Sequence, residues 1–446
     1  MFRNILLLAA CLTTLSCKGD DVLPNAGGEV CNVENDVVRY VLASSDAQFG
    51  ATASCIPQSI FDNSASYAYR ADQPSGKTIS FSCSDAPTAY VSLTDAALGT
   101  RLLSDTVQIN DGRGTYSFTN LTPNQTYRYQ VSTPDGRIIS DGTFSAAGRL
   151  RMIAIDGGFN IRDLGGWVGL AGRPVRYGQI YRGGSLGGTD MDGTHSDISA
   201  AGKAELARLG IRAQLDLRAA TNGGKYTGEG SLHSYSAAQA PLPTMDFNNT
   251  MTDYGAYNQD QSVVSDVAWI IYELRRGRPV YFNCRQGADR TGTVAFIIEG
   301  LLGCDRTAND AGGNQMAIDY ELTGFSQANR IDNWKVSTSA RPAAEAYANT
   351  NKLFRHLLDL QPAEPTITLT TLQEKCYYYL NRYTNPAWKA PVAHIDSADL
   401  DWFIQFMLGN MPNETYAPFR PTWAAQGEEL KTVAERCSNA VRYAEE

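Results

Sequence analysis

From Val280 to Gly303 the chain reads VYFNCRQGADRTGTVAFIIEGLLG, and this stretch decides the fold of the C-terminal part. Its first residues are apolar and lead to Cys284, a polar loop with one glycine follows, and apolar residues then return with helical spacing. Such a pattern predicts a buried strand, a tight loop and a helix, a connection typical of α/β domains.

The loop between the predicted strand and helix has the composition of an anion site. Gly287 allows a sharp turn, so that successive backbone N–H groups can point into one concavity at the positive end of the helix. Arg290 adds a planar guanidinium that can bind two phosphoryl oxygens. Cys284, at the floor of this positive site, is expected to exist as a thiolate that the Thr291 hydroxyl stabilises. A thiolate facing phosphorus is a nucleophile, so the stretch predicts phosphoryl transfer to Cys284 followed by hydrolysis.

The segment CRQGADRTG, Cys284 to Gly292, resembles the C-x5-R-[ST]-G signature of cysteine-based phosphatases. It is most similar to the bacterial tyrosine/phosphoinositide phosphatase branch, which usually reads H-C-x-x-G-K-D-R-T-G. The resemblance implies a protein-tyrosine-phosphatase-like α/β domain, Cys284 as nucleophile, Arg290 as the cation that holds transition-state charge, and no cofactor. It also implies a loop that binds the phosphate group of the substrate through Arg285, Gln286, Gly287, Ala288, Asp289 and Thr291.

Two positions depart from the pattern of that branch. Asn283 stands where the branch has His, so an amide must hold the loop in its place. Ala288 stands where the branch has the Lys that serves multiply phosphorylated lipids or inositols. The second departure weakens the phosphoinositide interpretation more than the phosphatase interpretation, so phosphotyrosine or another phosphomonoester is the expected substrate.

Upstream segments follow the same branch. Residues 157–166, GGFNIRDLGG, resemble its N-x-R-D-x-G-G motif, and residues 181–186, YRGGSL, resemble its next landmark, an arginine before a small-residue turn. Asn160, Arg162 and Asp163 are expected to brace the phosphate loop, although they could instead only close a turn.

The elements predicted around these motifs keep the same order. Helical spacing predicts helices over 199–209 and 263–274, and 211–217 has the character of a strand. Residues 318–323, IDYELT, resemble the D-Y-x-L-[ST] segment of the family. The chain beyond them is largely helical in pattern, and its aromatic residues could line a cleft or, more simply, fill the core.

A cysteine phosphatase also needs an acid, because the leaving oxygen takes a proton as the P–O bond breaks. The branch supplies this acid from a loop before the catalytic strand, where this chain reads PLPTMDF. Asp246 in that segment is the first candidate. Asp253, Asp216 and Asp289 are the alternatives.

Residues 46–149 have a different character. Short alternating runs such as TISFS at 78–82 and AYVSL at 89–93 are separated by turn residues, which predicts an antiparallel β-sandwich. The segment from Leu121 to Tyr127 has the L-x-P-x-x-x-Y spacing of a tyrosine corner. It resembles a fibronectin type III or related immunoglobulin-like (Ig-like) module, expected to act as a spacer or as a glycan- or protein-binding arm.

The N-terminus, MFRNILLLAACLTTLSC, has the form of a bacterial secretory signal. Its apolar run, residues 5–12, is too short to span a bilayer. Cys17 after small residues resembles the lipid-modified cysteine of lipoproteins, and KGDD after it resembles a surface-export tag. We therefore expect an exported protein, lipid-anchored through Cys17 in the bacterial outer membrane and facing the periplasm or the surface; an ordinary cleaved signal is the alternative.

The expected organisation is a multidomain chain: a lipoprotein signal peptide (1–17), a linker with some local order near Val37–Leu42 (18–45), the Ig/fibronectin III-like β-sandwich (46–149) and the cysteine phosphatase domain with extra helices (150–446).

Composition excludes several functions. The 446 residues carry a net charge of −9 without a basic cluster, so nucleic acid is not an expected partner. The four histidines show no metal-ligand spacing, so no metal is expected. Outside the signal, seven cysteines remain, and an odd number leaves at least one free thiol. The oligomeric state stays open.

Three competing interpretations remain. Cys284 could be an ordinary core cysteine, with Arg290 a surface charge. GGSLG at 183–187 satisfies the G-x-S-x-G pattern of serine hydrolases, with Ser185 as nucleophile, but a glycine-rich polar loop follows it where a helix is needed. The loop could also bind phosphorylated ligands without turnover, which would leave an exported, non-catalytic binding lipoprotein.

Overall fold

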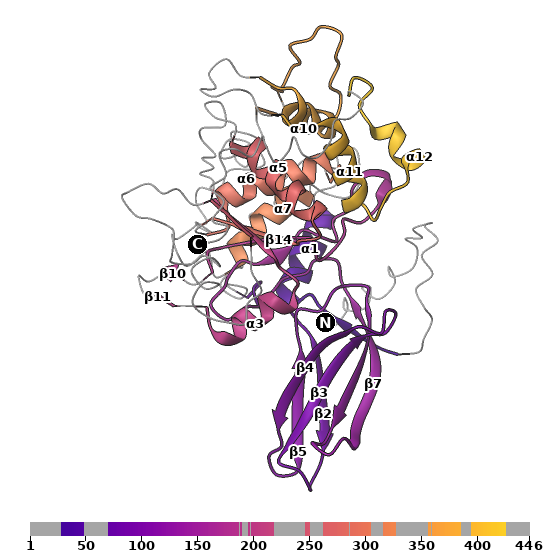
Figure 1. The fold of residues 1–446 in the computed structure, drawn as a ribbon, viewed down its shortest axis with the longest axis vertical. Coiled ribbons are helices and arrows are strands. Elements are labelled where there is room, and N and C mark those ends of the chain that lie inside the picture. The colour runs from indigo at the N-terminus through magenta and orange to yellow at the C-terminus, as the bar shows by residue number, and fades with distance from the viewer. Residues whose placement is uncertain are drawn as a thin grey trace, which may run out of the picture.

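The computed structural model divides the molecule into a strand-rich part and a helix-rich part, which lie at opposite ends in Figure 1. The residues that it describes are 28–48, 70–186, 188–189, 195–196, 198–217, 246–249, 262–284, 286–304, 315–326, 356–357, 359–384 and 394–424.

The strand-rich part, here called the β region, consists of β1 and the strands between residues 77 and 147. Five strands pair in the order β1-β7-β6-β3-β4, and β2 pairs with β5. All these pairings are antiparallel except that of β1 with β7. Alternate residues of β3 point into a core built around Phe118, Tyr127 and Phe144. The strands are β1 (Glu29–Asn32), β2 (Lys77–Ser82), β3 (Thr88–Asp95), β4 (Arg101–Gln108), β5 (Arg113–Phe118), β6 (Thr126–Ser132) and β7 (Ile138–Ala147).

Tyr127 has the contacts expected of a tyrosine corner. Its ring is buried, and its hydroxyl accepts a hydrogen bond from the Thr122 backbone N–H at 2.7 Å. The same hydroxyl donates to Gln125 Oε1 at 2.8 Å. The phenol therefore fixes the turn before β6, while membership of the fibronectin type III or Ig-like group stays a prediction.

The described end of the predicted linker, residues 28–45, is ordered structure rather than a tether. Strand β1 extends the five-stranded sheet, and helix α1 (Asp36–Gln48) follows it. Val37, Val38 and Val41 on α1 are fully buried in the hydrophobic cluster of the helix-rich part, because they form an apolar stripe at helical spacing. The local order expected near Val37–Leu42 is this helix, so the segment joins both parts of the molecule.

The helix-rich part is built on a second five-stranded sheet in the order β13-β12-β14-β9-β8. All pairings are parallel except that of β8 with β9. Strands β9, β12 and β14 are buried at every position, and β9 and β12 bury polar side chains as well as apolar ones. The strands are β8 (Arg162–Asp163), β9 (Ile180–Gly183), β12 (Ala213–Asp216), β13 (Asp246–Asn249) and β14 (Val280–Asn283), with a small antiparallel pair of β10 (Gly188–Thr189) and β11 (His195–Ser196).

Helices cover this sheet, and they include those predicted over 199–209 and 263–274. Ser199 caps the first of them by accepting from the Gly202 backbone N–H at 3.1 Å. Within the described residues no helix is both long and apolar enough to cross a membrane. The α-helices are α3 (Ala200–Arg208), α5 (Ser262–Arg275), α6 (Asp289–Leu301), α7 (Gln315–Glu321), α10 (Leu372–Asn381), α11 (Ser397–Met407) and α12 (Asn413–Tyr416), and short 3-10 helices span Leu170–Gly172, Leu322–Phe325 and Ala417–Phe419.

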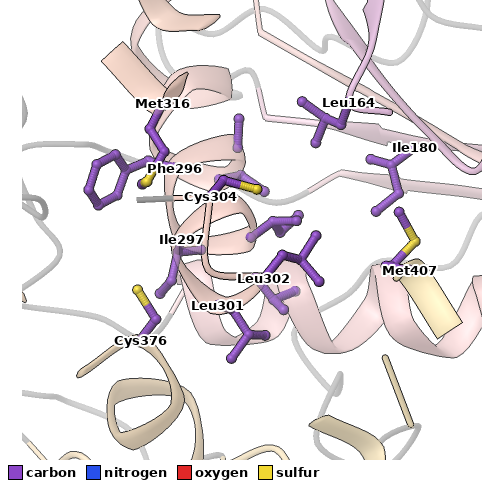
Figure 2. Packing of buried hydrophobic residues seen from close by; sticks show 14 of the residues in the cluster. Leu164, Ile180, Phe296, Ile297, Leu301, Leu302, Cys304, Met316, Cys376 and Met407 are labelled. Carbon is purple, nitrogen blue, oxygen red and sulfur yellow. The ribbon is translucent and has the colours of Figure 1, made fainter. Parts of the chain in front are cut away.

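The extra C-terminal helices complete the core around α6. Figure 2 shows Leu301 and Leu302 of α6 between the side chains of Ile180 and Cys376. A Cβ built on Gly300 would lie 2.7 Å from the Cys376 sulfur, so α10 packs closely against α6. Residues 377–379, three consecutive tyrosines, are buried as well. These described aromatic residues therefore belong to the core, as the simpler interpretation expected.

Asn120 of the β region makes several hydrogen bonds to the helix-rich part. Asn120 Nδ2 donates to the Ala154 carbonyl at 2.8 Å, and Asn120 Oδ1 accepts from the Ala154 N–H at 2.8 Å. The Asn120 carbonyl in turn accepts from Arg151 Nη2 at 2.8 Å. Asn120 has a φ of 55°, which an asparagine tolerates better than most residues. Each of these bonds joins a side chain of one part to the backbone of the other, and together they fix the orientation of the two parts at this point.

Candidate active site

Cys284 lies at the edge of the central sheet where ligands of α/β proteins usually bind. It follows β14 directly, and β14 lies between β12 and β9. In the register of the sheet, Asn283 is level with Asp216 on one side and Gly183 on the other. The carboxyl ends of three parallel strands therefore surround the position of Cys284.

The tight turn after Cys284 depends on Gly287. Its φ is 71°, in the left-handed region. A Cβ at this position would lie 2.7 Å from the Gly184 nitrogen and nearer still to the Gly183 carbonyl group. The glycine is thus required both by the backbone angle and by the close approach of the loop to the end of β9.

The carbonyl groups of the loop are held from behind. Asn160 Nδ2 donates to the Gln286 carbonyl at 2.9 Å and to the Gly287 carbonyl at 3.3 Å. Arg182 Nη2 donates to the same Gly287 carbonyl at 2.8 Å. Since these carbonyls are bonded to groups behind the loop, the N–H groups of the same peptides are left to face the opposite side.

Two buried arginines and one aspartate form the base of this support. Arg162 Nε donates to Asp319 Oδ1 at 2.7 Å, and Arg182 forms an ion pair with the other Asp319 oxygen. Arg162 Nη1 also donates to Asn160 Oδ1 at 2.7 Å, which orients the amide that holds the loop. The three charged side chains are at most 2% exposed. Burial of this kind is tolerated because each charge is paired and hydrogen-bonded.

Glu299, on α6, adds an acid to this buried cluster. Burial, and then the neighbouring Asp319 carboxylate, raises the pKa of Glu299 well above its ordinary value. Burial alone would also raise the pKa of Asp319, but Arg162 and Arg182 outweigh it and lower that pKa. Burial thus favours the neutral form of Glu299, and the two arginines favour the charged form of Asp319.

Cys284 and Thr291 are both buried beside the loop. Cys284 is 3% exposed and has hydrophobic neighbours at the end of β14. The Thr291 hydroxyl is fully buried and has no hydrogen-bond partner among the described residues. No side chain caps α6, so the first backbone N–H groups of that helix are not satisfied by a capping residue.

Arg290 points along the end of the sheet rather than out to water. It is partly buried, and its Nη1 donates to the Leu217 carbonyl, just after β12, at 3.1 Å. That position brings the guanidinium to the same edge of the sheet as Cys284.

Asn283, which stands where the related branch has a histidine, bonds to the backbone at Cys284 and to a neighbouring strand. Asn283 Nδ2 lies 3.3 Å from the Cys284 carbonyl and donates to it, and Asn283 Oδ1 accepts from Gln214 Nε2 at 2.7 Å. Both amide side chains are fully buried. A neutral amide pair, joining β12 to β14, therefore holds the backbone at the nucleophile position.

Asp163, one of the three residues expected to brace the loop, does not contact it and binds other groups. Its carboxylate accepts from the backbone N–H groups of Gly165 at 2.9 Å and Gly178 at 2.7 Å, and from Arg151 Nη1 at 3.2 Å. It closes a turn away from the loop, as the alternative interpretation proposed, whereas Asn160 and Arg162 do support the loop.

The placement of Asp246 disagrees with its expected role as general acid. It opens β13 and is level with Ala213 and Val280, at the amino end of the sheet. Cys284 lies four residues beyond Val280, about 13 Å further along the strand direction at ~3.3 Å per residue. The Asp246 backbone therefore lies at the opposite edge of the sheet from Cys284. The sequence pattern located the strand but not its register, which decides the edge at which Asp246 lies.

Several other expected residues lie outside what the structure describes. Arg285, Asp253 and Cys17 are among them, and the side chain of Asp289 is not described, although its backbone begins α6. Ser185 is buried and is followed by strand β10 rather than by a helix, which does not fit a serine-hydrolase elbow.

Among the described residues, no group of three or more His, Cys, Asp or Glu could hold a metal ion. No disulfide joins the cysteines that the structure describes, which are Cys31, Cys83, Cys284, Cys304 and Cys376.

Sequence reasoning did not assign a role to several residues that support the loop. Arg182 and Asp319 were found only as parts of motifs, and Gln214 and Glu299 were not singled out. A charged residue inside an apolar strand or helix was the available signal, since such residues are rarely buried unless paired.

Two comparisons with known proteins agree with this geometry. Residues 153–378 match the model of a family described as the tyrosine phosphatase family, which is just over half of the chain. A protein of Cupriavidus necator, named as a candidate tyrosine-protein phosphatase, is 28% identical over 195 residues, covering 39% of this chain and 67% of the relative.

Proposed function

Because the chain belongs to the tyrosine phosphatase family, we propose that it hydrolyses phosphate monoesters through a phosphocysteine on Cys284. The observation that carries this proposal is the support of the loop from behind. Asn160 and Arg182 bind the carbonyls of Gln286 and Gly287, so the loop's N–H groups can face a phosphate bound above Cys284.

In the first chemical step the Cys284 thiolate attacks phosphorus and the bond to the leaving oxygen breaks. Negative charge on the transferring phosphoryl group is stabilised by the loop N–H groups, by the first turn of α6 and by Arg290. Arg290 would exchange its bond to the Leu217 carbonyl for bonds to two phosphoryl oxygens.

In the second step water attacks the phosphocysteine, the S–P bond breaks, and the sulfur leaves as a thiolate. The Thr291 hydroxyl, which is buried without a partner, is suited to donate to that sulfur. Inorganic phosphate is released and the enzyme returns to its starting state. No cofactor takes part in either step.

The general acid must protonate the leaving oxygen, and we place Asp289 first among the remaining candidates. Asp289 begins α6, five residues after Cys284, whereas Asp216 is fully buried. Asp253 remains a candidate that follows β13 in the chain. We expect Asp289→Asn to lower kcat about 100-fold for an alkyl phosphate and much less for p-nitrophenyl phosphate, whose leaving group needs little protonation. Asp246→Asn serves as the comparison and should leave kcat unchanged.

The test of the proposal is p-nitrophenyl phosphate hydrolysis by the wild type, Cys284→Ser and Arg290→Ala. Turnover that both substitutions abolish, and that persists in a strong chelator, is expected. Trapping with a labelled substrate should give a phosphoenzyme in the wild type and none in Cys284→Ser. Loss of activity in the chelator would contradict the cysteine mechanism.

The non-catalytic alternative rests on Asn283 and Ala288, the two departures from the family pattern. In that case the loop would bind inorganic phosphate, and neither wild type nor Cys284→Ser would turn over any substrate. The buried bond between Asn283 and Gln214 favours the enzyme, because it supplies a hydrogen bond at the position that the histidine usually holds.

For the substrate we propose phosphotyrosine or another phosphomonoester, in keeping with the name of the Cupriavidus necator relative. Inositol phosphates and phosphoinositides are the variant. A panel of phosphopeptides, inositol phosphates and phosphoinositides compares them, and kcat/KM highest for phosphopeptides is the expected result.

The remaining features of the chain are proposals of the same kind. We propose that the β region is a fibronectin type III or Ig-like module, which the corner made by Tyr127 supports. We also propose export and a lipid on Cys17, supported by the N-terminal sequence alone. Membrane fractionation of wild type and Cys17→Ala tests the anchor: the substitution should release the protein from the membrane fraction.

A further inference from the structure

A short segment between α1 and β2 in the chain, residues 70–73, reaches the support of the phosphate loop. Asp72 is buried, and its Oδ1 accepts a hydrogen bond from the Asn160 backbone N–H at 2.9 Å. Its neighbour Ala71 donates its N–H to the Phe325 carbonyl at 3.0 Å. These two adjacent residues thus bind two different elements of the helix-rich part.

Both of those elements touch the loop or its support. Asn160 carries the amide that holds the Gln286 and Gly287 carbonyls, and the same amide donates to Thr323 Oγ1 at 3.1 Å. Thr323 and Phe325 belong to the same 3-10 helix. The pair at 71–72 therefore bonds both to Asn160 and to the 3-10 helix that carries its threonine partner.

The backbone conformation of Asn160 must be stabilised by neighbouring residues. Its φ of 55° lies in the left-handed region, which costs an asparagine some free energy and is kept only where the surroundings fix it. A buried N–H without an acceptor would add to that cost. Asp72 supplies the acceptor for this N–H, so the direction of the Asn160 side chain depends on a residue 88 positions upstream.

The segment that carries Asp72 is itself anchored. Asn35 Nδ2 donates to the carbonyls of Arg70 at 2.6 Å and Gln73 at 2.8 Å. Asn35 immediately precedes α1, whose valines are buried in the core of the helix-rich part. The turn from Arg70 to Gln73 is therefore held in place by the N-terminal helix.

We propose that Asp72 is a positioning residue of the phosphate loop, acting through Asn160. This inference rests on the proposed phosphatase function. The region that matches the family, residues 153–378, then lacks one contact that holds its own loop. The N-terminal segment supplies it, which gives α1 and residues 70–73 a part in substrate binding.

The test compares Asp72→Ala, Asp72→Asn and the wild type in the full chain. Asp85→Ala, an exposed aspartate of the β region, is the control. For p-nitrophenyl phosphate we expect Asp72→Ala to raise KM about tenfold, and inorganic phosphate to inhibit it with a constant raised by the same factor, because a displaced loop binds phosphate poorly. Asp72→Asn keeps an oxygen that can accept from Asn160 and should restore both constants to within about twofold of the wild type.

A purely structural role gives a different result. Loss of folded protein lowers the apparent kcat but leaves KM and the inhibition constant unchanged, because only correctly folded molecules are measured. Unchanged constants in Asp72→Ala would therefore overturn the inference, as would equal defects in Asp72→Ala and Asp72→Asn.

Failure of the phosphatase function can be told apart from failure of this inference. If the wild type has no turnover, the dissociation constant of inorganic phosphate, measured by calorimetry, replaces KM as the readout. Tight phosphate binding by the wild type, with a tenfold weakening in Asp72→Ala, would support the positioning role and contradict only the proposed phosphatase activity. Equal binding by both proteins, or none by the wild type, would overturn the positioning role.

Discussion

The two parts of the molecule use arginine–carboxylate pairs under opposite conditions. In the helix-rich part, the Arg182 and Asp319 side chains are each 1% exposed, and they hold the phosphate loop. In the β region, the Arg137 and Asp85 side chains are 50% and 65% exposed, and they join two surface positions. The same chemical pair therefore has different consequences, since water and salt weaken the second pair but cannot reach the first.

The contrast shows which part of the molecule depends on one fixed arrangement of its charged side chains. The β region is held by an apolar core and by one buried phenol, so its surface charges can change freely. Behind the phosphate loop, paired charged side chains occupy the buried positions that apolar side chains fill in the β region. A buried charge that loses its partner costs far more than the pair contributes, so the network permits essentially one arrangement. A loop that must position phosphate benefits from that restriction.

The largest effect is expected where a buried partner is removed. Asp319→Leu leaves the buried guanidinium groups of Arg162 and Arg182 without the carboxylate that pairs with both. We expect a loss of about 3–5 kcal/mol in the free energy of unfolding and loss of phosphatase activity. Urea denaturation measures the first. A variant with wild-type stability would contradict the role given to the network.

The next effect in size is expected in the pH dependence of the free energy of unfolding, to which the helix-rich part contributes through Glu299. Glu299 has a raised pKa, so its contribution to stability is complete below its ordinary value of 4.5 and is lost as pH rises toward its value in the folded protein. The free energy of unfolding of the wild type should therefore fall as pH rises above about 5. Glu299→Gln keeps a donor for Asp319 and should reduce this slope; the part due to Asp163, whose pKa burial also raises, should remain. An unchanged slope would assign the pH dependence to another group.

Removing the neutral amide pair should have an intermediate effect. Gln214→Leu deprives the buried Asn283 Oδ1 of its donor. We expect a loss of about 1–3 kcal/mol in stability, with kcat reduced more than KM because the backbone at Cys284 shifts. Thermal unfolding and steady-state kinetics measure these. Gln214→Met, which keeps the length of the side chain but has no donor, should behave like the leucine variant.

The buried phenol of the β region should count for less. Tyr127→Phe removes the bonds to Thr122 and Gln125 but keeps the ring in the core. We expect a loss of about 0.5–1.5 kcal/mol and unchanged kcat/KM. A change in kcat/KM would mean that the β region influences the loop beyond the contacts at Asn120.

The smallest effect is expected at the exposed pair. Arg137→Ala should leave the urea midpoint and the activity unchanged, at low and at high salt, because the Arg137–Asp85 pair is open to water. A salt-dependent loss of stability would contradict the difference proposed between buried and exposed ion pairs.

Features that depend on residues close together in the sequence were predicted correctly, whereas features that depend on distant residues were not. The strand before Cys284, the helix after it, the strands near 78–82 and 89–93 and the tyrosine contact were read from local patterns, and they occur as predicted. Asp246 was not placed correctly, because its distance from Cys284 depends on the register between β13 and β12. The ordered segment at 28–45 was predicted as a linker, because its valines find their partners far away in the chain.

The sequence by itself determined that a cysteine, a glycine turn and an arginine stand between a strand and a helix, since strand, turn and helix patterns are local properties of the chain. Only the tertiary structure decided what holds that loop: Asn160, Arg182, Asp319 and Asp72 come from separate segments. A buried polar side chain finds its partner through space, and no spacing along the sequence states which partner that is.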